Sequence, residues 1–107
     1  MTPYLINIQF TYPDGQEGGF NEIKVDSDIL SAMKYVLEEA KEKLQDCKVT
    51  EVSCKAFCEE DRAKAIDFLD KSIAFVEGYQ ELSLKEKSSA LEYLRNKKSF
   101  IESLRLQ

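Results

Sequence analysis

The chain has 107 residues, 43% of them hydrophobic and 10% aromatic, with 20 acidic and 15 basic residues and a net charge of −5. This composition is typical of one globular domain and excludes a disordered acidic tail. The chain contains no histidine, which removes the commonest general base and metal ligand, and no run of 18 apolar residues that could cross a membrane.

The first predicted element is a strand over residues 4–12, in which apolar and polar residues alternate. Pro13-Asp14-Gly15 predicts a turn, and Gly18-Gly19 adds backbone freedom to the connection. The chain begins directly with this strand and not with a secretion signal, so we expect a cytoplasmic protein. One face of the strand should carry Tyr4, Ile6, Ile8, Phe10 and Tyr12.

Residues 21–25 alternate again and predict the second strand of a β-hairpin. We expect Ile23 and Val25 to point inward, and Glu22 and Lys24 to point outward.

A helix is predicted from about residue 28 to residue 45, because apolar residues recur there at helical spacing. Asp26-Ser27-Asp28 provides the N-cap residues that helices prefer. Residues 49–57 predict a third strand, with its apolar side chains at Val52, Cys54 and Ala56.

The remaining chain predicts a helical hairpin, because two helical patterns are joined by a short connection. The acidic segment 59–61 suits the first turn of one helix, and Gly78 suits its end. Ser83 and Glu86 match a capping box at the start of the next helix. Each helix carries two adjacent apolar stripes.

Together these elements predict an α+β fold with ββαβαα order in a single domain, residues 1–107. We expect two layers, in which a mainly antiparallel three-stranded sheet of order 2-1-3 has three helices on one face. Within this domain, residues 1–57 form the hairpin-helix-strand part and residues 58–107 form the helical hairpin.

The three cysteines do not predict catalysis or a structural metal. Cys47, Cys54 and Cys58 lack the close Cys-x2-Cys pair of zinc sites, and we interpret them as reduced thiols, two of them in or near the core. Cys58 would begin a helix, whose dipole lowers a thiol pKa, but acids follow it and no histidine can act as its base. We therefore expect no catalytic residue, no cofactor and no metal.

Charge divides unevenly along the chain. Residues 1–82 contain 17 acidic and 9 basic residues, giving −8, whereas residues 83–107 contain 3 acidic and 6 basic residues, giving +3. The acids on the predicted helices are either simply solvated or form a docking face for a basic protein partner. The candidate residues for this face are Glu38, Glu39, Glu42, Glu59, Glu60, Asp61, Asp67 and Asp70.

The final helix also leaves alternatives open. Its basic residues could contact phosphate, or they could meet acids of the preceding helix or of a second subunit. Its aromatic residues, with those of the preceding helix, either cap the core or form an interface between subunits or with a partner. The candidate interface residues are Phe75, Tyr79, Tyr93, Lys97 and Phe100.

The sequence thus predicts a non-catalytic protein-interaction domain that binds, and inhibits or regulates, a larger partner. Small acidic chains of this kind are common among antitoxins, immunity proteins and phage-encoded inhibitors of host defence, and the analogy is one of composition only. A nucleic-acid-processing or defence complex would be a suitable target, because acidic side chains could occupy its phosphate-binding groove. The alternative function is a nucleic-acid-binding accessory subunit that uses the basic C-terminal helix, although the acidic body disfavours direct nucleic-acid binding.

Overall fold

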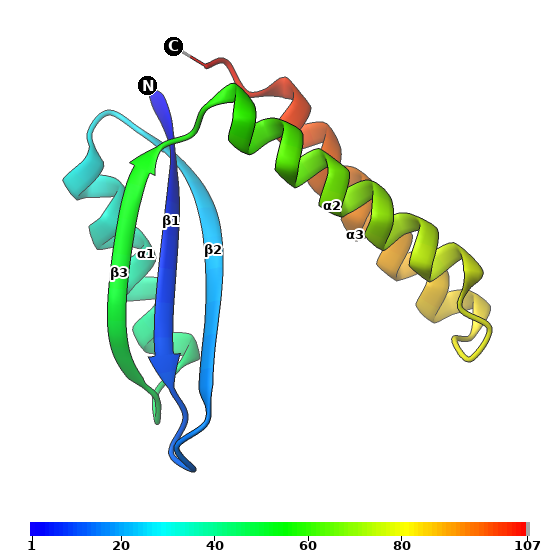
Figure 1. The fold of residues 1–107 in the computed structure, drawn as a ribbon, viewed down its shortest axis with the longest axis horizontal. Coiled ribbons are helices and arrows are strands. Elements are labelled where there is room, and N and C mark those ends of the chain that lie inside the picture. Colours follow the sequence, from blue (N-terminus) through cyan, green and yellow to red (C-terminus); the bar gives the residue numbers. More distant parts are fainter. Residues whose placement is uncertain (107) are drawn as a thin grey trace. The chain divides into compact units, whose positions relative to one another are not determined.

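The computed structural model describes residues 1–106 of the chain and contains three strands and three helices in that range (Figure 1). Their order is ββαβαα, as the sequence predicted. The elements are β1 (Thr2–Thr11), β2 (Glu17–Asp26), α1 (Ile29–Lys43), β3 (Lys48–Ala56), α2 (Glu59–Gly78) and α3 (Leu84–Ser103).

The chain divides into two compact units, and the division lies between Phe57 and Cys58. The first unit contains the sheet, α1 and Leu106, and the second contains α2 and α3. Each unit has its own buried side chains.

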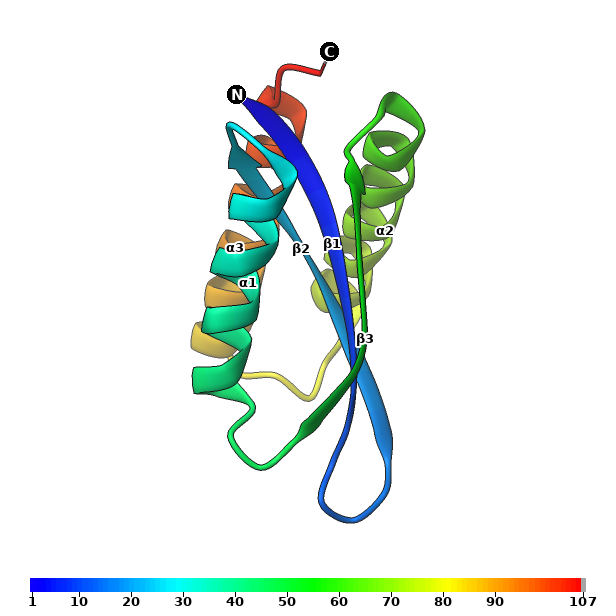
Figure 2. The ribbon, with the colours of Figure 1, turned by 90° about the vertical axis from the view of Figure 1, so that its left-hand side faces the viewer.

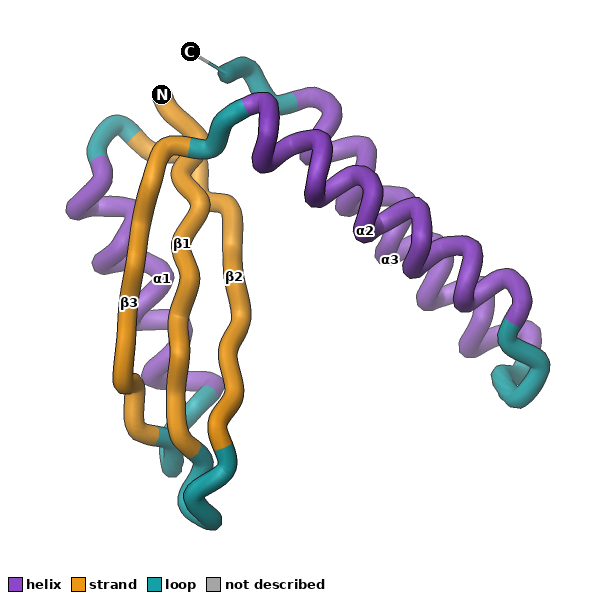
Figure 3. Tube along the Cα trace, in the orientation of Figure 1, coloured by secondary structure: helices purple, strands orange, loops and turns teal. Residues whose placement is uncertain are grey.

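The first unit is a three-stranded antiparallel sheet with α1 on one face (Figures 2 and 3). The strand order is β2-β1-β3, which confirms the predicted order with the first strand in the centre. α2 and α3 belong to the second unit, and their predicted packing on the same face of the sheet stays a prediction. The core between sheet and helix consists of Ile6, Ile8, Phe10, Ala32, Val36 and Ala40.

The turn between β1 and β2 fixes how the two strands pair. The Tyr12 N–H donates to the Gln16 carbonyl at 2.8 Å, and Gly15 takes a φ of +88° that suits glycine. Thr11 therefore pairs with Glu17, and every even-numbered residue of β1 lies opposite an even-numbered residue of β2.

This register shows that the predicted orientation of β2 is wrong. Ile23 pairs with Leu5 and Val25 pairs with Pro3, so these side chains lie on the sheet face opposite α1. Glu22 pairs with the core residue Ile6 and lies on the α1 face, as does Lys24. The length of the turn set this register, and a shift of one residue reverses every side chain of a strand.

Gly18 and Gly19 belong to β2 and not to the loop that the sequence suggested. A Cβ atom at Gly18 would lie 2.9 Å from the ring of Phe10, its cross-strand partner. The missing side chain therefore allows the Phe10 ring to lie over the neighbouring strand.

β3 contains an irregularity where it pairs with Gln9 and Phe10 of the central strand β1. Gln9 pairs with Glu51 whereas Phe10 pairs with Val49, so Thr50 is an extra residue in β3. This is the pattern of a β-bulge, which bends the strand locally. Beyond it, Val52 and Cys54 pack against the core as predicted, whereas Ala56 is exposed.

The second unit is a helical hairpin in which α2 and α3 pack against each other. The predicted capping box of α3 is confirmed, because Glu86 N–H donates to the Ser83 hydroxyl at 3.1 Å and Ser83 N–H donates to the Glu86 carboxylate at 3.4 Å. Leu69 on α2 and Ile101 on α3 are buried.

Candidate interaction surface

Five large aromatic side chains remain exposed on the helical hairpin, and we call them the aromatic strip. Aromatic side chains of this size usually bury most of their surface, so five exposed together make this group a candidate contact surface. The strip consists of Phe68 (69% exposed), Phe75 (65%) and Tyr79 (37%) on α2 with Tyr93 (64%) and Phe100 (46%) on α3.

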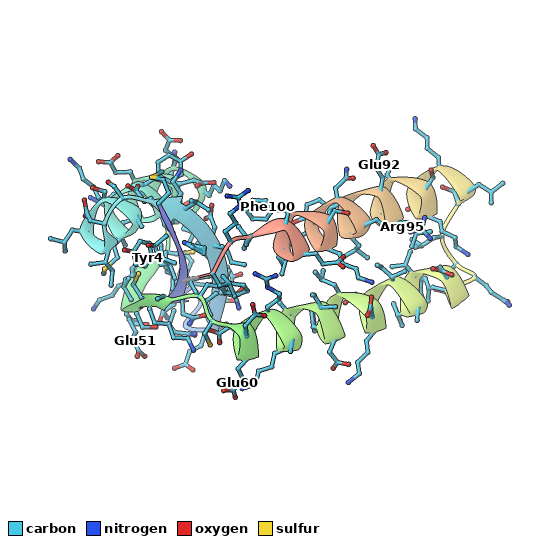
Figure 4. All side chains as sticks on the ribbon, turned by 90° about the horizontal axis from the view of Figure 1, so that it is seen from above. Tyr4, Glu51, Glu60, Glu92, Arg95 and Phe100 are labelled. Atoms are coloured by element: carbon cyan, nitrogen blue, oxygen red, sulfur yellow. The ribbon has the colours of Figure 1, made fainter. Side chains whose placement is uncertain are left out.

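Ion pairs between the two helices mark one side of the hairpin. The Arg95 guanidinium lies 3.4 Å from the Glu77 carboxylate, and the Lys98 ammonium lies 2.6 Å from the Asp70 carboxylate. The Asp70 carboxylate raises the pKa of Lys98 by hydrogen bonding. Figure 4 shows Arg95 between the helices, in agreement with its pairing.

The aromatic strip occupies the other side of the hairpin. On α2, Phe75 lies two positions before Glu77. On α3, Tyr93 lies two positions before Arg95. Two residues differ by about 200° around an α-helix, so each aromatic side chain points away from the ion pairs. Because the ion pairs join one side of both helices, the aromatic residues of α2 and α3 share the opposite side.

The acidic candidate residues of α2 form hydrogen bonds or ion pairs within the chain. Asp61 accepts a hydrogen bond from the Cys58 backbone N–H at 3.1 Å, and Asp70 pairs with Lys98. The others form pairs one turn along the same helix, which are Glu59–Arg62 (3.5 Å), Glu60–Lys64 (3.2 Å) and Asp67–Lys71 (2.9 Å). The helical hairpin therefore presents no run of unpaired acids, and a docking role for this group stays a prediction.

The acidic candidates on α1 differ among themselves. Glu38 and Glu42 are exposed one turn apart and form no ion pair within residues 1–106. Glu39 is partly buried and pairs with Lys43 at 2.7 Å, and this hydrogen bond lowers the Glu39 pKa. Residues 1–57 contain 10 acidic and 6 basic residues, giving −4, whereas residues 58–105 contain 10 and 9, giving −1. Most of the excess negative charge is therefore carried by the sheet unit.

Glu22 on β2 faces Glu39 on α1, a pair that the sequence analysis missed because it placed Glu22 outward. Burial raises the pKa of Glu22, and the nearby Glu39 charge and a hydrogen bond between the two side chains raise it further. Only the paired register of β2 could have revealed this contact. On the same face, the Lys24 ammonium lies 3.8 Å from the centre of the Tyr35 ring.

We expect Glu22→Gln to stabilise the protein at pH 7 by about 0.5 kcal/mol, because glutamine supplies a hydrogen-bond donor to Glu39 and removes a like charge opposite it. A raised pKa in the folded state stabilises the fold below the unfolded-state value, and this contribution is lost as the pH rises through the folded-state value. The advantage of the variant should therefore disappear near pH 4. Urea unfolding at both pH values measures it.

The matched control for this prediction is Glu51→Gln, which changes an exposed glutamate on the other face of the sheet. Its stability should follow that of the original chain at both pH values. A Glu22→Gln variant that is less stable at pH 7 would contradict the described carboxyl pair.

Packing against the core explains the positions of two of the three cysteines. Cys47 and Cys54 pack against the sheet core, as predicted, and burial raises the pKa of the Cys54 thiol. Cys58 is exposed at the start of α2, and its thiol donates to the Asp61 carboxylate at 3.1 Å. Among residues 1–106, no group of three or more Cys, Asp or Glu side chains is arranged to hold a metal ion.

Two basic residues of α3, Lys87 and Arg95, line a shallow groove of about 480 Å³ on that helix. Lys87 donates to the Glu77 carbonyl at 3.2 Å, and Arg95 pairs with the carboxylate of the same residue. Basic residues of α3 thus meet α2 directly, which was one of the two interpretations left open by the sequence. The groove is lined by Leu84, Lys87, Ser88, Leu91, Glu92, Arg95 and Asn96.

None of the helices in the described part of the chain combines the length and apolarity needed to cross a bilayer. Comparison with protein-family models, with curated proteins and with solved structures finds no match to this chain.

Proposed function

We propose that this protein is a small acidic, non-catalytic interaction domain that binds, and inhibits or regulates, a larger protein partner. The observation that supports this proposal is the aromatic strip of α2 and α3, where five large side chains are 37–69% exposed on one side of the helical hairpin. Exposed aromatic clusters are typical of protein interfaces, because each ring contributes a large apolar area with little loss of conformational entropy.

The charge of the sheet unit favours a partner with a basic surface. Residues 1–57 carry −4, and Glu38 and Glu42 on α1 are exposed without an internal ion pair in the described chain. Charge of this kind accelerates association with a positive surface and selects against negative partners. A nucleic-acid-processing or defence complex, whose phosphate-binding surface is basic, fits this requirement.

The proposal predicts that the tagged chain, expressed in its source cells, retains one protein in stoichiometric amount. Phe75→Lys should lose that protein, because it places a charge in the aromatic strip. Glu38→Lys combined with Glu42→Lys should weaken retention and reduce its sensitivity to salt. Affinity purification over a series of salt concentrations, followed by mass spectrometry, measures each effect.

The matched control is Leu84→Lys, which replaces an apolar side chain that is 87% exposed and lies outside the aromatic strip. It should retain the partner as the original chain does. Recovery of no stoichiometric protein at any salt concentration would contradict the proposal, and recovery of nucleic acid instead would favour the accessory-subunit alternative.

A further inference from the structure

We infer that the outer edge of β2 binds an extended segment of a protein partner, which joins the sheet as an additional strand and carries a basic residue opposite Glu22. This edge belongs to the sheet unit, whereas the aromatic strip belongs to the helical hairpin. The proposed function enters only in that the occupant is taken to be part of a protein. Three features of β2 favour this occupant: its outward backbone groups, its regular pairing and its charge.

Alternate backbone groups of β2 point away from the rest of the sheet. The Tyr12 N–H donates to the Gln16 carbonyl at 2.8 Å, and hydrogen-bonded pairs of an antiparallel ladder recur at every second residue. Even-numbered residues of β2 therefore bond to β1. The odd-numbered residues direct their N–H and C=O groups to the other side, where β2 has no neighbouring strand within residues 1–106 (Figure 3). These residues are Glu17, Gly19, Asn21, Ile23 and Val25.

The regular pairing of β2 suits the addition of a strand. An extended peptide matches a row of outward groups, because its own N–H and C=O groups alternate with the same period. β2 pairs with β1 over ten successive residues without a register shift, whereas β3, the other outer strand, is interrupted at Thr50. An antiparallel peptide continues the pattern of this sheet and forms the more stable kind of ladder.

The charge of β2 favours a basic segment over a second copy of the same strand. β2 contains three acidic residues and one basic residue, giving −2, so two β2 strands would repel each other. The one basic residue, Lys24, lies over the Tyr35 ring at 3.8 Å.

Glu22 is the acidic residue of β2 that a basic side chain would meet on the α1 face. It lies beside Glu39, and Lys43 pairs with Glu39 at 2.7 Å while its charge also acts on Glu22. Side chains directly opposite on neighbouring strands have Cβ atoms about 5 Å apart. An arginine or lysine opposite Glu22 would therefore place a second cation beside two carboxylates that share one.

The other face of β2 favours apolar side chains in the occupant. Ile23 and Val25 lie on this face, and Ile23 pairs with Leu5 of β1. All three are partly buried, and an apolar residue opposite either of the two β2 residues would extend this apolar area. Because side chains alternate between faces, an antiparallel segment opposite residues 25 to 22 should read apolar, any residue, apolar, basic.

Titration of the isotope-labelled full-length chain with one synthetic peptide, followed by NMR, tests the inference. The peptide acetyl-Lys-Val-Thr-Ile-Arg-Thr-Val-Thr-Lys-amide places its isoleucine opposite Ile23 and its arginine opposite Glu22. We expect a Kd of about 100 µM or tighter. The backbone amides of odd-numbered β2 residues should gain protection from hydrogen exchange when the peptide is bound. A peptide with glutamate in place of the arginine should bind roughly tenfold more weakly.

Two variants of the chain, each with a matched control, test the two kinds of contact. Glu22→Gln should weaken binding of the arginine peptide about threefold, whereas Glu51→Gln, the same change on β3, should leave the Kd unchanged. Asn21→Pro should weaken binding roughly tenfold, because proline removes one outward N–H. Asn21→Thr keeps that N–H and should bind as the original chain does. If Asn21→Pro does not fold, the comparison of Glu22→Gln with Glu51→Gln still decides.

Absence of binding at about 1 mM peptide would overturn the inference, as would binding that leaves the β2 amides unchanged. Protection of the odd-numbered β2 amides that rises with protein concentration alone would place a second copy at this edge and would also overturn it. Equal affinity for the arginine and glutamate peptides would contradict the basic residue opposite Glu22. If the peptide does not bind but Phe75→Lys still loses the captured partner, the role of the β2 edge is wrong and the proposed function stands.

Discussion

Ile8→Ala is expected to lower the free energy of unfolding by about 3–4 kcal/mol, because it leaves a cavity in the centre of the core. Ile8 is 0% exposed, and its neighbours on the same sheet face are Phe20 of β2 and Val52 of β3. Val36 of α1 belongs to the same core cluster. These neighbours come from two strands and one helix, so the surrounding structure cannot collapse easily into the space left by the side chain.

Equilibrium unfolding in urea, followed by circular dichroism, measures this effect. Ile29→Ala is the matched control, since it removes the same atoms from a side chain that is 39% exposed at the start of α1. We expect the control to cost less than 1 kcal/mol. A similar loss for both variants would show that Ile8 is not in a tightly packed position.

Leu69→Ala should have the second largest effect and should act on the helical hairpin. Leu69 is 4% exposed on α2, at the centre of the stripe that packs against α3, and its truncation should cost about 2–4 kcal/mol. None of the sheet-core residues belongs to α2 or α3, so we expect the helical signal to fall while the sheet unit keeps its structure. Circular dichroism at 222 nm is a suitable measure, because α2 and α3 have 20 residues each and α1 has 15.

Backbone amide hydrogen exchange separates the two units in this experiment. Protection should be lost in α2 and α3 and retained in β1. Leu84→Ala serves as the control, because this leucine is 87% exposed and its truncation should cost little. Equal loss of protection in β1 would contradict separate cores.

The order and type of the elements could be predicted because each depends on local signals. The alternation of β1, the acidic start of α2 and the capping box of Ser83 with Glu86 depend on residues a few positions apart. The strand order β2-β1-β3 followed from the most apolar strand being central, and the structure confirms it.

The orientation of β2 could not be predicted from alternation, because Ile23 and Val25 would suit either face of the strand. The turn from Tyr12 to Gln16 decides the face, and its hydrogen bonds are not visible in a hydrophobic pattern. The contact between Glu22 and Glu39 was missed for the same reason.

For the charged and aromatic candidate residues, too, contacts within one helix could be predicted, whereas contacts between helices could not. The pairs of Glu60 with Lys64 and of Asp67 with Lys71 follow from spacing on one helix, and the sequence could have predicted them. The pair of Asp70 with Lys98 depends on how α2 and α3 align, so it required the structure. That alignment also shows that Phe75 and Tyr93 share one side of the hairpin, which spacing on a single helix cannot establish.

The extra residue Thr50 in β3 affects how readily a strand of another molecule could add to the edge of the sheet. β2 and β3 are the outer strands, so each presents backbone hydrogen-bonding groups to which a foreign strand could add. At the β3 margin, the kink beside Val49 interrupts the straight ladder that an added strand requires. The β2 margin pairs evenly over ten residues, so ordered fibrils, if destabilising conditions produce them, should begin from β2.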